Sequence, residues 1–545
     1  MKEIFLNLSH YTIVWIILVI VFSFPVISPL LKEGYFPTHD GEWAIVRLAE
    51  MHREIKDLQI PPRWADFLNH GHGYPLFLFT YPFPYYLSEI FHLVGFGLVS
   101  SIKIVFILST VSSGIFMFYL GKRINGNLAG FIAAVLYIYA PFRLVDLYVR
   151  GSLGESVSLA IFPLLFLATL SLVTNPNLVR VVAVASIFAI LITTHNAMAL
   201  LFTPFYLAFI FVAIKMYSED WKRYLIRFFL PAILLGLGLS SYFWLPSLLE
   251  SKFIILSQVP LADKGQHFVN INEFVYSPWN YGLRPSFQIG WMHLVLFIIE
   301  IIVLFILRGI VAKKLIYIGL FSIAASVISV FMMNQISALL WEAPLLSSVD
   351  FPWRFMTLLT FFMSLGAIYI VEKRIFKILS LVLIILAFFL VQNFARPQMF
   401  FERGEEYYET NDDTTTSAGE LMPVWVKELP KSRPTEKTML LGGNANITNT
   451  IYNSKMITIE GLAQTQAKIG INTIYFPGWT IKVNNTLVNP DYSNNRGIIT
   501  FDIPPGPFQI KGTFERTPIR LLADLISLVS IIFVFAVFIK IALKR

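Results

Sequence analysis

The sequence predicts a polytopic α-helical membrane protein with a small β-domain close to its C-terminus. Of its 545 residues, 56% are hydrophobic and only 14% are charged, a balance too apolar for a compact soluble globule. Many apolar segments approach the ~20 residues that a helix needs to cross a bilayer core. Strand-like sequence with turn-forming residues appears only beyond residue 420.

About twelve membrane spans are expected from these apolar segments. The first segment carries no charge, and no small-residue cleavage site follows it, so we expect it to be a retained signal anchor. The expected spans are residues 11–31, 102–121, 128–145, 157–173, 179–193, 197–214, 228–248, 289–307, 315–333, 355–371, 378–394 and 519–540.

Basic residues cluster in alternate loops between these spans, and this pattern predicts the orientation. The positive-inside rule makes their face cytoplasmic, together with both termini. The long first loop, residues 32–101, is then extracytoplasmic in the cell membrane. Topology also explains the net charge of +8, so we expect no nucleic-acid partner. The basic positions are Lys122, Arg123, Arg180, Lys215, Lys222, Arg223, Arg227, Arg308, Lys313, Lys314, Lys373, Arg374, Lys377, Lys544 and Arg545.

Two segments of the first loop are predicted to be helices that do not span. Residues 44–58 alternate apolar and charged positions with helical spacing, which indicates an amphipathic helix at the interface, ended before Pro61. Residues 82–97 are apolar but short, and they contain Glu89 and His92. A charged acid costs about 2.5 to 3.5 kcal/mol at the bilayer centre, so we interpret this segment as an interfacial or re-entrant helix.

The amino-acid composition changes after residue 395, where the predicted transmembrane domain (1–395) ends. Residues 396–419 form an acidic, Thr-rich linker, and 518–545 contain the last transmembrane helix. Between them, 420–517 predict an extracytoplasmic β-sandwich or jelly-roll-like domain with Trp479 inside. Its expected strands are 456–460, 469–476, 480–483, 498–503 and 508–514.

Charged and imidazole side chains gather at the outer ends of the expected spans. The first loop opens with His39, Asp40 and Glu42. A carboxylate at a membrane surface can serve as a general base, and an arginine there can bind a phosphate. The other outer positions are Arg150, Glu155, His195 and Arg354.

Each candidate also has a purely structural alternative. Asp40 can cap a helix, and Glu42 can interact with the helix dipole. Arg150 and Glu155 can form an ion pair that closes a loop. His195 can be a satisfied histidine near a helix end, and Arg354 can be an interfacial anchor.

Several short motifs carry a resemblance to known families. Tyr139-Ala-Pro-Phe followed by Arg150-Gly-Ser-Leu-Gly-Glu155 is similar to the second-loop pattern of oligosaccharyltransferases, in the GT-C superfamily of glycosyltransferases. An Asp-Asn-Glu stretch of that pattern is reduced here to Glu155. The whole chain resembles a bacterial membrane family labelled 6-pyruvoyl-tetrahydropterin synthase-related. Its C-terminal motifs, Tyr475-Phe-Pro-Gly-Trp479 and Phe514-Glu-Arg-Thr-Pro518, resemble GT-C-like proteins that carry a β-domain after the spans.

The resemblance implies a cell-envelope glycosyltransferase that moves a sugar from a polyprenyl-phosphate donor to an acceptor on the extracytoplasmic face. Asp40, Glu42 and His39 would be catalytic. Arg150, Glu155, His195 and Arg354 would bind substrate. The alternative is a non-catalytic protein that binds or transports an envelope lipid or polysaccharide, because carboxylates and arginines around a lipid headgroup give the same pattern.

No cofactor follows from the motifs. The family label does not imply pterin chemistry, since the chain has no Cys and only His70-Gly-His72 resembles a zinc-ligand pattern. No nucleotide-binding motif is present, because Gly236-Leu-Gly238 lies inside an apolar span. If the reaction uses a divalent ion such as Mg²⁺ or Mn²⁺, Asp40, Glu42 and Glu155 are the expected oxygen ligands.

Overall fold

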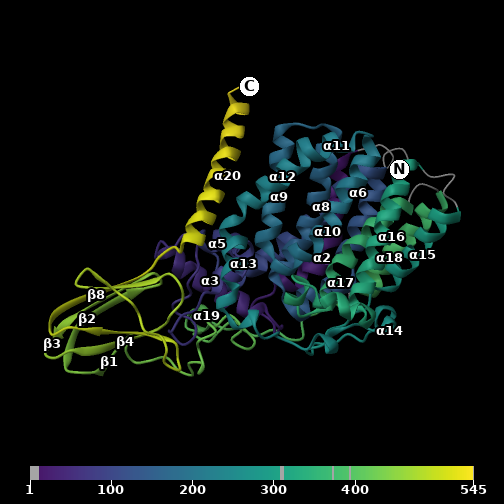
Figure 1. Cartoon of the computed structure of the whole chain (residues 1–545). Helices are drawn as coiled ribbons and strands as arrows, with labels where there is room; N and C mark the ends of the chain where they lie inside the picture. Colours follow the sequence, from purple (N-terminus) through teal and green to yellow (C-terminus); the bar gives the residue numbers. More distant parts are fainter. Residues whose placement is uncertain (1–10, 307–311, 371–373, 392–393, 544–545) are drawn as a thin grey trace.

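The computed structural model describes residues 11–306, 312–370, 374–391 and 394–543. Long helices form a bundle that contains most of the described chain (Figure 1). The strands lie at one end of this bundle, and the C-terminal helix α20 (Pro518–Ala542) stands at its side. The predicted basic positions Arg308, Lys373, Lys544 and Arg545 lie outside the described residues.

Helices occur at the positions of the predicted spans, but twelve spans are not confirmed. Among the described residues, six helices are long and apolar enough to cross a membrane, or seven if one bent pair is a single span. The bundle helices are α2 (Thr12–Ile27), α6 (Leu98–Ile138), α8 (Leu153–Thr174), α9 (Leu178–Thr194), α10 (Asn196–Tyr217), α11 (Trp221–Tyr224), α12 (Leu230–Leu239), α13 (Ser241–Glu250), α15 (Trp291–Ile306), α16 (Lys313–Met333), α17 (Phe355–Ile370) and α18 (Arg374–Val391).

The boundaries of the second and third predicted spans differ in the structure. Helix α6 covers both of them and is interrupted by non-helical backbone at Asn125 and Gly126, where the φ of +88° suits glycine. The segment predicted as 128–145 leaves the helix at Ile138. It continues as the short helix α7 (Pro141–Val145) and the π-helical turn η2 (Asp146–Arg150).

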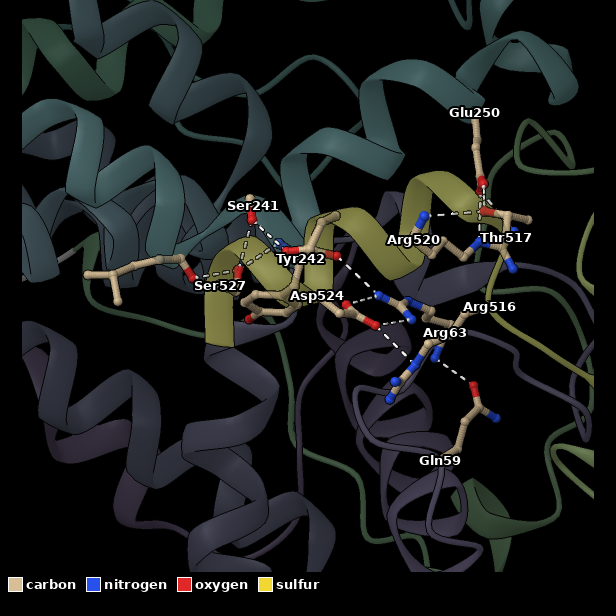
Figure 2. Close-up of polar contacts among 12 residues, drawn as sticks. Gln59, Arg63, Ser241, Tyr242, Glu250, Arg516, Thr517, Arg520, Asp524 and Ser527 are labelled. Atoms are coloured by element: carbon tan, nitrogen blue, oxygen red, sulfur yellow. Dashed lines mark hydrogen bonds and ion pairs between the residues drawn. The ribbon is translucent and has the colours of Figure 1, made fainter. Parts of the chain in front are cut away.

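The predicted span 228–248 is bent, because the helix breaks at Ser240 into α12 and α13. The bent pair turns by 71°. A serine from the C-terminal helix compensates the break, and Figure 2 shows Ser527 beside Ser241 and Tyr242. The Ser527 hydroxyl lies 3.0 Å from the Gly238 carbonyl oxygen and accepts the Tyr242 amide at 2.9 Å. The backbone groups that lose their helical hydrogen bonds at the bend therefore still have hydrogen-bond partners, although no water reaches them.

The first loop contains three helices, α3 (Gly41–Lys56), α4 (Leu76–Phe79) and α5 (Phe83–Leu93). Helix α3 confirms the predicted amphipathic helix. Helix α5 confirms the helix expected within 82–97, and its 11 residues are too few to cross a bilayer. Glu89 on α5 is buried and contacts His52 Nδ1 of α3 at 2.7 Å, so a protein partner offsets the cost of burying this acid.

The C-terminal strands form two antiparallel sheets, one of three strands (β1-β4-β7) and one of five (β2-β3-β8-β5-β6). All five predicted strands are confirmed, with ends moved by a few residues, whereas β1, β2 and β6 were not predicted. The strands are β1 (Thr438–Gly442), β2 (Ala445–Asn453), β3 (Met456–Ala463), β4 (Ala467–Ile474), β5 (Trp479–Val483), β6 (Thr486–Val488), β7 (Ile498–Ile503) and β8 (Gly506–Phe514).

The sheets are docked on the first loop. Trp479 is 5% exposed, as predicted, and its ring centroid lies 5.7 Å from that of Trp64 in the first loop. Lys437 donates to Asp66 at 2.9 Å and to the Gly71 carbonyl at 2.7 Å. The β-region therefore shares a core with the first loop.

Three ion pairs fix the base of α20, as Figure 2 shows: Arg63 and Arg516 both pair with Asp524, and Arg520 pairs with Glu250. Arg63 of the first loop holds Asp524 through two hydrogen bonds of 2.5 and 3.1 Å. Glu250, at the end of α13, accepts from Arg520 at 2.8 and 2.9 Å and from the Thr517 hydroxyl at 2.6 Å. Both Glu250 and Arg520 are almost fully buried.

We expect a topology reporter fused after Gly126, Lys215 or Lys377 to indicate the cytoplasm, and one inserted within 403–419 to indicate the outside. The basic clusters determine this orientation. Paired alkaline phosphatase and fluorescent protein fusions measure it. An external signal at Gly126 combined with an internal signal at 403–419 would contradict the orientation.

Removing one partner of the Glu250–Arg520 pair should be costly. We expect Arg520→Leu to lower the free energy of unfolding by about 3–5 kcal/mol, because a buried carboxylate loses its cation. Thermal unfolding of the purified protein measures the loss. The double variant Glu250→Leu/Arg520→Leu should recover part of the stability. An equal loss in the double variant would show that the charge pairing is not the cause.

Candidate functional site

The segment His39–Gly41 is held at the start of α3 by the turn that follows η2. The His39 amide donates to the Val149 carbonyl at 3.1 Å, and the Asp40 amide donates to the Arg150 carbonyl at 2.8 Å. A Cβ on Gly151 would lie only 2.9 Å from Gly41 Cα, so the two backbones touch directly. Glycine at both positions allows this close approach, and Gly151 also has a φ of +62°.

A threonine caps α3 in place of Asp40. The Gly41 amide donates to Thr38 Oγ1 at 2.9 Å, while the Asp40 side chain makes no capping hydrogen bond. Asp40 occupies the N-cap position, but its half-buried carboxylate is not used by its own helix. This distinguishes it from an ordinary capping aspartate.

A buried ion cluster lies directly behind this segment. The Arg150 guanidinium donates to Asp146, and its Nη2 lies 2.8 Å from Glu155 Oε1. Thr357 of α17 lies 2.7 Å from Glu155 Oε2 and 3.3 Å from Asp146 Oδ2. The Arg150 guanidinium also stacks over Trp353 at 4.5 Å. Arg150 therefore joins η2, α8 and the start of α17.

Arg354 and His195 approach the same carboxylate. Arg354 Nε lies 3.7 Å and His195 Nε2 3.8 Å from Glu155 Oε1. The side chain of Arg354 is 23% exposed and that of Arg150 only 4%, so Arg354 is the more accessible guanidinium. The His195 ring stacks on Tyr81 with centroids 4.8 Å apart. The structure thus brings together all four residues that the sequence suggested for substrate binding.

Burial sets the charge state of this cluster. Desolvation, followed by the positive charge of Arg354, lowers the pKa of His195 to about 3, so its imidazole is neutral at physiological pH. Its Nδ1 accepts the Met198 amide at 3.3 Å and caps α10. Burial, with the charge of Glu155 adding to it, raises the pKa of Asp146 to about 7. Glu155 is the carboxylate on which both arginines converge.

Glu42 and His39 point to other parts of the chain. Glu42 accepts a hydrogen bond from Arg403 of the linker, and burial raises the pKa of Glu42 although Arg403 opposes the shift. His39 Nε2 lies 3.0 Å from the Gly282 carbonyl oxygen. Burial, followed by the charge of Arg150, lowers the pKa of His39. Glu42 is thus tied to the linker rather than to Glu155.

The expected divalent-ion ligands are not gathered at one point. Among the described residues, the one group of three metal-type ligands with atoms within 4.8 Å is His70, Asp412 and Asp413. That group joins the first loop to the linker, and Arg433 already pairs with Asp412 at 2.9 Å. A role for Asp40, Glu42 and Glu155 in metal binding stays a prediction.

Sequence reasoning missed three side chains of the site. The role of Asp146 could have been predicted, since Asp146 precedes Arg150 by four residues and ion pairs form at that helical spacing. Thr38 also fits a known pattern, a threonine just before a helix. Thr357 had no indication, because it resembles any other small polar residue in an apolar span.

Comparison with solved structures finds proteins that resemble this chain in structure but have low sequence identity to it. The arabinofuranosyltransferase AftD from Mycobacteria is 15% identical, with a TM-score of 0.46 over 72% of this chain, which spans only 27% of that enzyme. The oligosaccharyltransferase of Archaeoglobus fulgidus is 13% identical, with a TM-score of 0.42 over 78% of this chain and 61% of that one. ArnT from Cupriavidus metallidurans is 15% identical, with a TM-score of 0.26 over 65% and 77%.

The family comparison is more extensive. No curated protein matches the chain. The family model described as "6-pyruvoyl-tetrahydropterin synthase related domain; membrane protein" matches residues 78–398, which is more than half of the 545 residues. The chain therefore belongs to the 6-pyruvoyl-tetrahydropterin synthase related family of membrane proteins.

Proposed function

We propose that this protein is a membrane glycosyltransferase, which moves a sugar from a polyprenyl-phosphate donor to an acceptor on the extracytoplasmic face. The observation that carries the proposal is the carboxylate of Asp40. Thr38 caps the helix, and the Asp40 carboxylate makes no hydrogen bond or ion pair with any other described residue. Backbone hydrogen bonds hold it beside a buried cluster that contains two arginines.

In the proposed reaction Asp40 is the general base. It takes the proton from an acceptor hydroxyl or amine while the acceptor atom attacks the anomeric carbon of the sugar. The bond between that carbon and the phosphate oxygen breaks, and the phosphate leaves with its electron pair. A phosphate is a good leaving group and needs no strong acid. Attack from the opposite face inverts the anomeric centre. If a divalent ion takes part, Glu42 and Glu155 remain its proposed additional ligands.

Arg354 is the proposed partner of the leaving phosphate. Its guanidinium is partly exposed, and within the described part of the chain its one ion contact is the 3.7 Å approach to Glu155. Arg150 is engaged by Asp146 and Glu155, and it contributes to substrate binding mainly by fixing Glu155. His195, neutral and stacked on Tyr81, offers a polar edge to a sugar without adding charge.

The alternative, a protein that binds or transports an envelope lipid or polysaccharide without chemistry, uses the same arginines but has no need of Asp40. A measurement of turnover distinguishes the two functions, because only the transferase releases polyprenyl phosphate. We expect the purified protein to release polyprenyl phosphate from a lipid-linked sugar in the presence of an acceptor extract. Binding of the lipid-linked sugar with no release over a panel of donors would favour the alternative.

Asp40→Asn keeps the size of the side chain and removes its proton acceptance. We expect turnover to fall about 10²- to 10⁴-fold with donor binding nearly intact, as for loss of a general base. Release of the lipid phosphate measures the rate. Asp502→Asn, on an exposed position of β7, is the matched control. Turnover at the parental rate in Asp40→Asn would remove Asp40 from the mechanism.

Arg354→Ala should change affinity rather than rate. We expect donor binding to weaken by about 1.5–3 kcal/mol, because a charge-assisted hydrogen bond to the phosphate is lost. Isothermal titration with a polyprenyl-phosphate sugar measures the affinity, and Arg496→Ala on the exposed β-region is the control. Unchanged affinity together with a normal unfolding temperature would assign Arg354 to the structural alternative.

A further inference from the structure

A cavity lies where the chain leaves its first span and enters the next. It has a volume of about 510 Å³ and lies between the end of α2, the start of α6 and the linker. Both helices are candidate membrane spans, so this cavity lies at the boundary between the bilayer core and the headgroups. Its lining residues are Leu30, Leu31, Lys32, Glu33, Gly34, Phe96, Val99, Ser100, Lys103, Ile104, Ile107, Glu402, Arg403 and Glu405.

The cavity contains a buried cation, Lys103, which forms no close ion pair among the described residues, although the charge of Glu33 acts on it from a longer distance. Lys103 is 7% exposed, and its ammonium donates to the carbonyl oxygens of Lys32 and of Gly34, the latter at 3.0 Å. No ion pair joins Lys103 to an acid anywhere in the described ranges. An ammonium has three donors, so one remains for a ligand. A buried charge of this kind is costly unless an anion approaches it.

The rim of the cavity carries equal numbers of both charges. Its cations are Lys32, Lys103 and Arg403, and its acids are Glu33, Glu402 and Glu405. Arg403 is bonded to Glu42 and retains further guanidinium donors, with a side chain that is 34% exposed. Glu405 accepts the Leu98 amide at 2.7 Å and is thereby occupied at the start of α6.

The other wall is apolar and continues to the lipid-facing surface. Leu31 is 60% exposed at the end of the first span, and Leu108, which follows the lining residue Ile107 on α6, is 50% exposed. Ile104 and Ile107 line the cavity itself on the same helix. A ligand in this place meets charged groups at one end and hydrocarbon at the other.

We propose that this cavity binds a zwitterionic phospholipid that carries a phosphate and a primary ammonium. The phosphate lies against Lys103 and Arg403, the ammonium lies against Glu33 and Glu402, and the acyl chains follow Leu31 and Ile107. A purely anionic headgroup would leave the two acids facing it. The volume is in the range of about 300–1,000 Å³ that small-molecule sites occupy. This inference does not rest on the proposed glycosyl transfer.

Native mass spectrometry of the purified, lipid-stripped full chain tests the proposal, with phosphatidylethanolamine and phosphatidylglycerol as probes. We expect phosphatidylethanolamine to bind more tightly than phosphatidylglycerol. Arg403→Gln and Lys103→Gln should each weaken this binding about tenfold or more, because each removes a charge-assisted hydrogen bond. Ser100→Trp should obstruct the cavity from an exposed position of α6, whereas Leu108→Trp, outside the lining, should not.

Two results would overturn the proposal. Tighter binding of phosphatidylglycerol would overturn the zwitterionic assignment. Parental affinity for phosphatidylethanolamine in both Ser100→Trp and Arg403→Gln would place the lipid elsewhere and overturn the site. If Lys103→Gln does not fold, these two variants still decide, since both positions are exposed. Neither outcome depends on turnover, so failure of the glycosyltransferase proposal leaves the result readable.

Discussion

The buried guanidinium of Arg150 is the interaction on which the rest of the site depends. Its side chain satisfies two buried carboxylates, Asp146 and Glu155, and its backbone carbonyl accepts the amide of Asp40. Two buried acids without a cation would be strongly unfavourable, and removing one partner of such a group costs about 3–5 kcal/mol. Helix α8, helix α17 and the start of α3 thus take their relative positions from one residue. Arg354 approaches Glu155, and the backbone of the half-buried Asp40 is bound to the Arg150 carbonyl.

The first loop connects this site to the C-terminal part of the chain. It holds the site at one end and receives the β-region at the other, through Trp64 and Asp66. Arg63 of the same loop fixes α20 through Asp524. The β-region is therefore attached at the loop as well as through its own two chain connections. A displacement of the strands would move the loop that carries Asp40.

Local patterns predicted most elements, and contacts between distant segments explain the failures. The amphipathic helix α3 and five strands follow from periodicity. The break at Ser240 could not be predicted, because its compensating partner, Ser527, lies far away in the sequence. Strand β2 was missed because its Asn- and Thr-rich sequence resembles a loop. At the site, charge and position predicted Glu155 and the three residues Arg150, His195 and Arg354 around it, whereas the function of Thr357 depends wholly on packing.

The direct contact between Gly41 and Gly151 has a consequence for how such a site can diversify. Since a Cβ on Gly151 would lie 2.9 Å from Gly41 Cα, a larger residue at position 151 forces the two backbones apart, and a larger residue at position 41 meets the side chains of Tyr35 and Thr38. New specificity must therefore arise in the surrounding wall, at positions such as Tyr81 and Trp353, while the glycine pair stays fixed. The position of the acid is therefore set by backbone contact, and the chemistry around it is set by side chains that can be replaced one at a time.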